Sequence, residues 1–198
     1  VRDALGPVRI ARTERPGHAA ELAVEAARDG ARTVVSPGGD GTHHEVVNGL
    51  ARVGDPSLTL AVLPFGTGGD LRRSLHPSGF VAMLRAIPTL TPRPLDLGEA
   101  RFVTDDGVAS RRVFVNVASC GVSGAIDRRV NASSKSLGPL SFLASAAAAL
   151  ARWEPPRVRV TVDGRALEPL RLSVAAVCNG RYAGGGMRVE ARAQLDDG

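Results

Sequence analysis

One carboxylate within a run of glycines is the part of this sequence best suited to chemistry. Residues 38–42 read Gly-Gly-Asp-Gly-Thr and follow four residues, 33–36, that are β-prone or small. After them, apolar residues recur at helical spacing, which predicts a strand, a tight loop and a helix. Thr42 and Glu45 have the spacing of a capping box, so the helix is predicted to begin where the glycines end. Such a helix N-terminus carries unpaired amide donors and binds phosphate.

Asp40 is the unusual member of this loop. A carboxylate repels a bare phosphate but suits one that arrives with a divalent metal ion. His43 and His44 follow directly, and we expect them to line the phosphate pocket or to cover it through their backbone. They are not expected to act as bases, because the sequence identifies no carboxylate that would orient either ring. The loop lacks the lysine of the common P-loop, and the alternative is a turn that merely joins a strand to a helix.

A second glycine-rich turn follows the next predicted strand. Residues 64–69 read Pro-Phe-Gly-Thr-Gly-Gly and come directly after the apolar run 58–63, which has the length of a buried parallel strand. Strands and helices that alternate in this way form a βαβ unit. Because open α/β sheets bind ligands at the carboxyl ends of their strands, we expect both turns to lie at one ligand-binding edge.

The composition is that of an ordinary globular protein. Of the 198 residues, 43% are hydrophobic and 23% are charged, which leaves room for one large or two small domains. The net charge is +5, and Lys135 is the only lysine, so the basic residues are almost all arginine. We attribute this first to the amino-acid bias of a GC-rich genome and second to a surface that faces phosphate or an anionic membrane. Aromatic residues are only 4% and no basic tract is interleaved with them, so nucleic acid is not an expected partner.

The remaining sequence features concern the compartment and the chain ends. Cys120 and Cys178 lack metal-ligand spacing, and we expect buried reduced thiols in a cytoplasmic protein. The apolar run 142–150 is too short to cross a bilayer and no signal peptide precedes it, so any membrane contact is expected to be peripheral. The chain begins with Val1 and stops within an apparent turn, so both of its domains are expected to be incomplete.

The predicted secondary structure changes near residue 95. The first part alternates predicted helices, the earliest over 17–29, with the two apolar strands. From residue 96, short β-prone runs flank Asp-Gly turns, and an alanine-rich helix is expected over 140–153. The predicted organisation is an α/β domain over 1–95 and a mainly β, sandwich-like domain over 96–198.

Three motifs together resemble a known enzyme family. They are Gly-Gly-Asp-Gly-Thr at 38–42, the segment PFGTGGDLRR at 64–73, and CNGRYAGGGMRVEARAQLDDG at 178–198. The set is similar to the diacylglycerol kinase catalytic domain, a family that includes sphingosine kinases and bacterial YegS-like lipid kinases. NAD kinases and phosphofructokinases share the first motif but lack the third, so the third favours the lipid kinases. Gly69 stands where the family has Asn, and Arg192 where it has Pro.

The resemblance implies a fold, a reaction and a set of site residues. The first domain would be an α/β domain like that of phosphofructokinase or NAD kinase, and the reaction would be ATP-dependent, Mg²⁺-assisted phosphorylation of a hydroxyl group of diacylglycerol or a related lipid. The expected ATP contacts are Thr13, Gly38, Gly39, Asp40, Gly41, Thr42, His43, His44, Gly66 and Thr67. The aspartates expected to share a metal and water network are Asp40, Asp70 and Asp96. A second metal site would use the Gln194 carbonyl and Asp197.

The same resemblance places the general base on an acidic residue beyond Gly198, so no catalytic base is expected within this chain. It also implies a lipid substrate met at a membrane surface, with peripheral contact at the inner face, and it leaves a homodimer open. Two alternatives remain. One is an NAD-kinase-like enzyme, and the other is an inactive truncated module that binds nucleotide or membrane. The structural alternative for Asp96 is an aspartate in a turn, and the structural alternative for Asp197 is a plain Asp-Gly hairpin.

Overall fold

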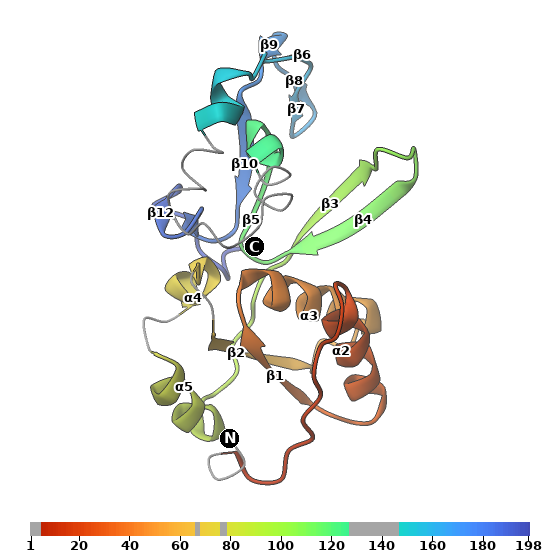
Figure 1. Ribbon diagram of the computed structural model, residues 1–198, viewed down its shortest axis with the longest axis vertical. Helices are drawn as coiled ribbons and strands as arrows, with labels where there is room; N and C mark the ends of the chain where they lie inside the picture. The colour runs from red at the N-terminus through yellow and green to blue at the C-terminus, as the bar shows by residue number, and fades with distance from the viewer. Residues whose placement is uncertain (1–4, 66–67, 76–78, 127–146) are drawn as a thin grey trace. The chain divides into compact units, whose positions relative to one another are not determined.

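The computed structural model describes residues 5–65, 68–75, 79–126 and 147–198. Packing divides the chain into two compact units. The first unit joins two separate stretches, Val1–Val117 and Cys178–Gly198, and the second is Ala118–Val177. The chain is of the expected mixed α/β class (Figure 1). The expected division into domains at residue 95 stays a prediction.

A parallel strand pair forms the centre of the first unit. β1 (Thr33–Gly38) pairs with β2 (Thr59–Pro64) in a register that runs from Thr33 opposite Thr59 to Gly38 opposite Pro64. The chain crosses between them through α3 (Asp40–Val53), which gives the predicted βαβ unit (Figure 1). Both expected strands are confirmed, and each continues one or two residues further into its glycine-rich turn.

The helix α2 (His18–Arg28) packs closely against α3. Its buried residues are three alanines, Ala19, Ala20 and Ala23, rather than the full apolar face. Small residues are needed here because α3 presents Gly49, where a Cβ atom would lie 2.3 Å from the Ala20 carbonyl oxygen. The two backbones therefore approach each other too closely for larger side chains.

Two apolar clusters hold the rest of the first unit together. α4 (Asp70–Leu75) contributes Leu71 to a cluster that includes Val62 from β2. α5 (Phe80–Ala86), continued by the short 3-10 helix η1 (Ile87–Thr89), packs Met83 and Leu84 against Leu63. Burial of these side chains fixes both helices beside the carboxyl end of β2.

The predicted hairpin around Asp105-Asp106-Gly107 is present. β3 (Gly98–Val103) pairs with β4 (Ala109–Phe114), and Gly107 adopts a φ of 82° that its turn requires. β4 contacts α3, so the hairpin is anchored at its base. A second small hairpin, β11 (Tyr182–Ala183) with β12 (Met187–Arg188), carries three consecutive glycines in its turn (Figure 1).

The second unit consists of short paired strands. β5 (Val117–Gly121) pairs with β10 (Val174–Cys178), β6 (Arg157–Val158) with β9 (Leu170–Arg171), and β7 (Thr161–Val162) with β8 (Arg165–Ala166). Residues 147–151 are helical, in agreement with the expected alanine-rich helix, whose earlier part lies outside the described residues.

Two expectations about cysteines and membrane spans can be compared with these elements. Cys120 is exposed and Cys178 only half-buried, so the prediction of buried thiols is wrong for Cys120. Its strand, β5, has a single partner strand among the described residues and leaves one side of the chain open. None of the helices in the described ranges is long and apolar enough to cross a bilayer.

Candidate functional site

The glycine-rich loop passes directly from β1 into α3. The helix begins at Asp40 with Gly39 as its N-cap and has no side-chain cap, so it starts two residues before Thr42. The predicted capping box is therefore wrong. The Glu45 carboxylate instead accepts hydrogen bonds from the start of α2, at Gly17 N (2.8 Å) and Ala19 N (3.2 Å). Glu45 thus pairs with the start of another helix instead of with the start of its own helix.

The loop presents its backbone to a ligand. The first hydrogen bond of α3 runs from His43 N to the Gly39 carbonyl (3.1 Å), so the amides of residues 40–42 precede the helical ladder. A Cβ at Gly39 or Gly41 would meet nothing within 4 Å, whereas one at Gly38 would lie 2.6 Å from Cβ of Thr42. Unpaired helix amides beside open space are the arrangement that binds a phosphate group.

His43 lies in the core rather than in a pocket. Its side chain is 2% exposed, and Nδ1 lies 2.8 Å from the Ser36 hydroxyl, which is buried as well. Burial lowers the pKa of His43, against the opposing effects of the Asp40 charge and the Gly38 carbonyl. The ring therefore does not line a phosphate pocket, and the His43 amide is already bonded to the Gly39 carbonyl, so the expected contact of His43 with ATP stays a prediction.

Asp40 connects the two glycine-rich turns. Its Oδ2 accepts a hydrogen bond from Asp70 N and its Oδ1 one from Leu71 N, both at 3.2 Å, so the carboxylate caps α4. Gly68 permits this approach, because a Cβ there would lie 2.9 Å from Asp40 Oδ2. A carboxylate offers about four lone-pair positions, so two remain for a metal-bound water or a hydroxyl group. The predicted ATP contacts Gly66 and Thr67 lie outside the described residues.

Asp70 is bound by protein groups on both oxygens. Its Oδ2 accepts a hydrogen bond from Gly185 N (2.9 Å) in the triple-glycine turn, and its Oδ1 one from Arg73 (3.2 Å). The side chain is 9% exposed. Asp70 therefore joins α4 to the C-terminal segment, a contact between residues 115 positions apart in sequence.

Asp96 binds the Asp-Asp-Gly turn at the end of the chain. Its carboxylate accepts a hydrogen bond from Gly198 N (2.8 Å), and its own amide donates to the Leu195 carbonyl (2.7 Å). Asn179 donates to the Asp96 carbonyl (2.8 Å) and to that of Val115 (2.9 Å). By these contacts, Asp96 is associated with the C-terminal turn, close to the predicted second metal site.

Metal binding at these aspartates stays a prediction. Across the described residues, no group of three or more His, Cys, Asp or Glu side chains could hold an ion. This applies to the expected network of Asp40, Asp70 and Asp96 and to the expected site at Gln194 and Asp197. Mg²⁺ is often held by one or two carboxylates together with substrate phosphates and water, an arrangement that a small carboxylate set such as this one fits.

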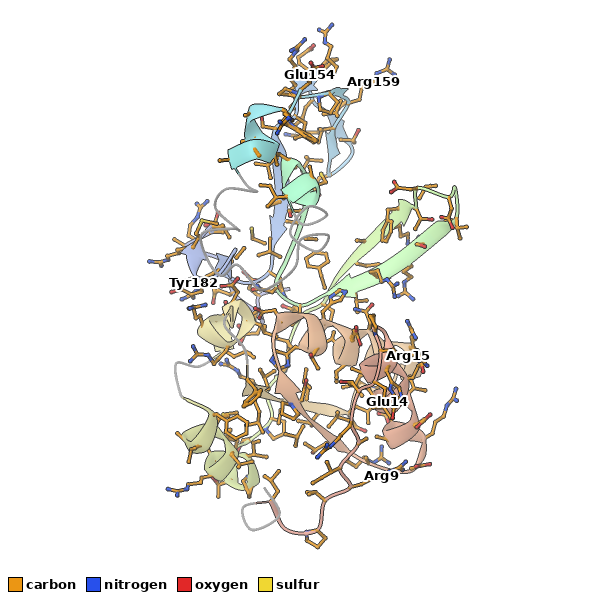
Figure 2. All side chains as sticks on the ribbon, in the orientation of Figure 1. Arg9, Glu14, Arg15, Glu154, Arg159 and Tyr182 are labelled. Carbon is orange, nitrogen blue, oxygen red and sulfur yellow. The ribbon has the colours of Figure 1, made fainter. Side chains whose placement is uncertain are left out.

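A cavity of about 140 Å³ adjoins the Asp40 carboxylate. Its lining combines a carboxylate, an imidazole and an amide with apolar side chains: Asp40, His44, Leu71, Phe114, Val115, Asn116 and Val117. Burial and the nearby Arg112 charge lower the pKa of His44, so its ring is neutral near pH 7. The Asn116 amide donates to the Tyr182 carbonyl (2.8 Å), and Figure 2 labels Tyr182 in the small β11–β12 hairpin.

Sequence analysis singled out the glycine-rich loop but missed several polar side chains that join the segments around it. Ser36, Asn116 and Asn179 each stand alone within apolar or strand-like runs, and that isolation is the signal that could have identified them. Thr13, a predicted ATP contact, is exposed in the segment before α2, and no hydrogen bond within the described part of the chain joins it to the loop.

Comparison with known proteins identifies the family. The family model described as the diacylglycerol kinase catalytic domain matches residues 1–100. The model described as the YegS C-terminal NAD kinase beta sandwich-like domain matches residues 116–198. A Bacillus anthracis crystal structure described as a diacylglycerol kinase is similar with a TM-score of 0.69 and 25% identity, over 99% of this chain and 60% of that one.

Curated relatives agree with this match. A Pseudomonas aeruginosa protein named a probable lipid kinase YegS-like is 31% identical over 94% of this chain and 58% of its own length. The Escherichia coli lipid kinase YegS is 29% identical over 94% of this chain and 60% of its own length. The chain thus spans about 60% of the length of these relatives. Its first hundred residues, which hold the glycine-rich loop, Asp40 and Asp70, match the kinase family model, and the chain belongs to the diacylglycerol kinase catalytic-domain family.

Proposed function

We propose that this chain is the nucleotide- and acceptor-binding part of an ATP-dependent lipid kinase that phosphorylates a hydroxyl group of diacylglycerol or a related lipid. The observation that carries the proposal is the position of Asp40. Asp40 is the first residue of α3, whose first amides face open space. The Asp40 carboxylate lines the cavity beside that helix. A phosphate donor on one side and a hydroxyl acceptor on the other would meet at this side chain.

The donor side suits a nucleotide triphosphate. Residues 38–42 supply backbone donors, and Asp40 supplies the negative charge that a phosphate tolerates only with a metal ion between them. Mg²⁺, when bound with ATP, would neutralise charge on the β- and γ-phosphates. The chain's own contribution is to orient the phosphates and to hold Asp40 in place through the amides of α4.

The acceptor side favours a lipid over a dinucleotide. The cavity of about 140 Å³ beside Asp40 is lined mainly by apolar side chains. The apolar walls formed by Leu71, Phe114 and the neighbouring valines suit the uncharged part of a lipid next to its hydroxyl group. An NAD-kinase-like activity is therefore the weaker alternative.

A lipid acceptor also implies a location for the protein. We place it in the cytoplasm with peripheral contact at the inner face of the membrane, where its substrate lies. We leave open whether the protein forms a homodimer.

The test is substitution of Asp40 in the whole natural protein that contains this chain. Asp40→Ala is expected to reduce kcat by about a hundredfold or more, because the group that mediates between metal, phosphate and acceptor is lost. Asp55→Asn is the matched control, since Asp55 is a surface aspartate paired with Arg32. Activity is measured with diacylglycerol and separately with NAD at saturating ATP and Mg²⁺. Near-normal turnover of folded Asp40→Ala would refute the proposal, and phosphorylation of NAD alone would favour the alternative.

A further inference from the structure

Three arginines gather on one face of a hairpin in the second unit. β6 pairs with β9 so that Arg157 lies directly opposite Arg171. Arg159 lies just after β6, two positions from Arg157, and is exposed like the other two. The intervening Val158 and the cross-strand Leu170 are partly buried on the opposite face.

Among the described residues, no acidic side chain pairs with these arginines. Their neighbours two positions along the chain are Pro155, Thr161, Pro169 and Ser173, none of which is acidic, and the exposed Glu168 before Pro169 forms no ion pair with them. Within the described residues none of the three guanidinium groups forms a hydrogen bond or an ion pair. Glu154 is labelled near Arg159 in Figure 2 but is not ion-paired with any of them. Like charges directly opposite each other destabilise a strand pair, so this arrangement favours an external anion.

The β3–β4 hairpin holds a similar arginine pair beside a carboxylate. In the β3–β4 hairpin, Arg101 also lies directly opposite an arginine, Arg111. There the Glu99 carboxylate bridges both guanidinium groups, with contacts of 2.5 Å to each. The same cross-strand arginine pair therefore occurs twice, once with an internal carboxylate and once without.

We propose that Arg157, Arg159 and Arg171 form a docking surface for an anionic membrane, with lipid phosphates in the place that Glu99 occupies in the other hairpin. The far end of the same hairpin exposes two apolar side chains, Val162 (52%) and Leu167 (46%). Arginines that bind phosphates together with apolar groups that enter the interface are the combination that holds proteins at a lipid surface. The inference rests on the proposed function, which requires that the protein meet its substrate in a membrane.

Vesicle sedimentation of the full chain tests this surface. Binding is measured without nucleotide or acceptor, on vesicles of phosphatidylcholine alone and with about a third phosphatidylglycerol, since each arginine near an anionic surface contributes about 1 kcal/mol. Arg157→Gln with Arg171→Gln should therefore lower partitioning onto the anionic vesicles about thirtyfold. Arg101→Gln with Arg111→Gln removes the same net charge and should change it by less than about threefold, because Glu99 already binds both guanidinium groups and offsets one of their two charges.

Every outcome of this experiment decides the question. An equal loss in both double variants would show a general charge effect and overturn the docking surface. Undiminished binding of the Arg157/Arg171 variant would overturn it as well, as would binding to duplex DNA of mixed sequence in preference to vesicles. A whole natural protein that binds anionic vesicles through these arginines but phosphorylates no lipid would refute the proposed function alone. An active kinase that is indifferent to anionic lipid would refute only the docking surface.

Discussion

At the scale of single residues, buried polar side chains set the geometry of the glycine-rich loop. The Ser36 hydroxyl and the His43 ring hold the end of β1 to the first turn of α3, with the loop between them. A buried polar group without a partner costs about 1 to 3 kcal/mol, so each of the two stabilises the other. The pair thereby restrains the residues whose amides face the proposed phosphate site.

The His43 ring should make stability depend on pH. Burial lowers the pKa of His43 in the folded chain, while the unfolded chain retains a value near 6.5. As the pH falls below about 6.5, the unfolded chain takes up a proton that the folded chain resists, so the free energy of unfolding decreases. The slope can reach about 1.4 kcal/mol per pH unit for this one group.

Urea unfolding between about pH 8 and pH 5 measures this dependence. Replacing both partners, as Ser36→Ala with His43→Leu, removes the titrating group without leaving an unpaired one. This variant should lose less stability on acidification than the natural chain. His44 is retained in both proteins, so the difference between them isolates His43. Identical pH dependence in the two proteins would contradict the assignment of a buried neutral ring.

At this scale, prediction from sequence worked where the type of a residue is informative by itself. Asp40 stood out from its loop by type alone, and the structure places it between the two turns as expected of a central group. Glu45 was assigned to a capping box because Thr42 has the right spacing, but its actual partners lie 26 and 28 residues away. Local spacing does not reveal a partner on another helix.

At the scale of elements, α3 organises the first unit. It begins at the glycine-rich loop, packs on α2 along one side, and contacts β4 along another. The contact with β4 is polar, since Asn48 donates to the Val113 carbonyl (2.9 Å) and accepts from the Val113 amide (3.0 Å). The Asn48 side chain thus supplies the donor and the acceptor that a neighbouring strand would supply, and it pairs both backbone groups of the buried Val113.

Asn48→Leu should consequently destabilise the chain by about 2 to 4 kcal/mol, because it leaves both the amide and the carbonyl of buried Val113 unpaired. Urea unfolding followed by circular dichroism measures the loss. Arg52→Ala on the exposed end of the same helix is the control and should shift stability by no more than about 0.5 kcal/mol. A change in Asn48→Leu as small as that of the control would mean that water replaces the side chain.

Regular elements were the best predicted part of the fold. The strands at 33–38 and 59–64 and the helix at 18–28 follow directly from apolar runs and helical spacing. The β-prone run over residues 112–118 is divided between β4 and β5. Asn116 interrupts it, and its carbonyl accepts the amides of Asn179 and Gly180. A break imposed by a distant segment leaves no local pattern.

At the scale of the whole molecule, the first unit is discontinuous in sequence. Residues 178–198 return to it and complete its hydrogen bonds through Asn179, Gly185 and Gly198. Only the resemblance of motifs, and no periodicity, connected this segment with the glycine-rich loop. Contacts between residues more than a hundred positions apart depend on the whole fold, so local sequence patterns do not predict them.

Two matched deletions should therefore have opposite effects on the first unit. Residues 116 and 179 are joined by a hydrogen bond of 2.8 Å, so a Gly-Ser linker of about four residues can replace 118–177 without strain. That variant should keep its cooperative unfolding transition. Removal of residues 178–198 should instead lower the free energy of unfolding by about 3 kcal/mol or more, because Asp70, Asp96 and the Val115 carbonyl lose their partners. If the chain without residues 178–198 unfolded at the same urea concentration as the natural chain, this prediction would be wrong. The contacts of Asp70 and Asp96 with that segment would then contribute nothing to stability.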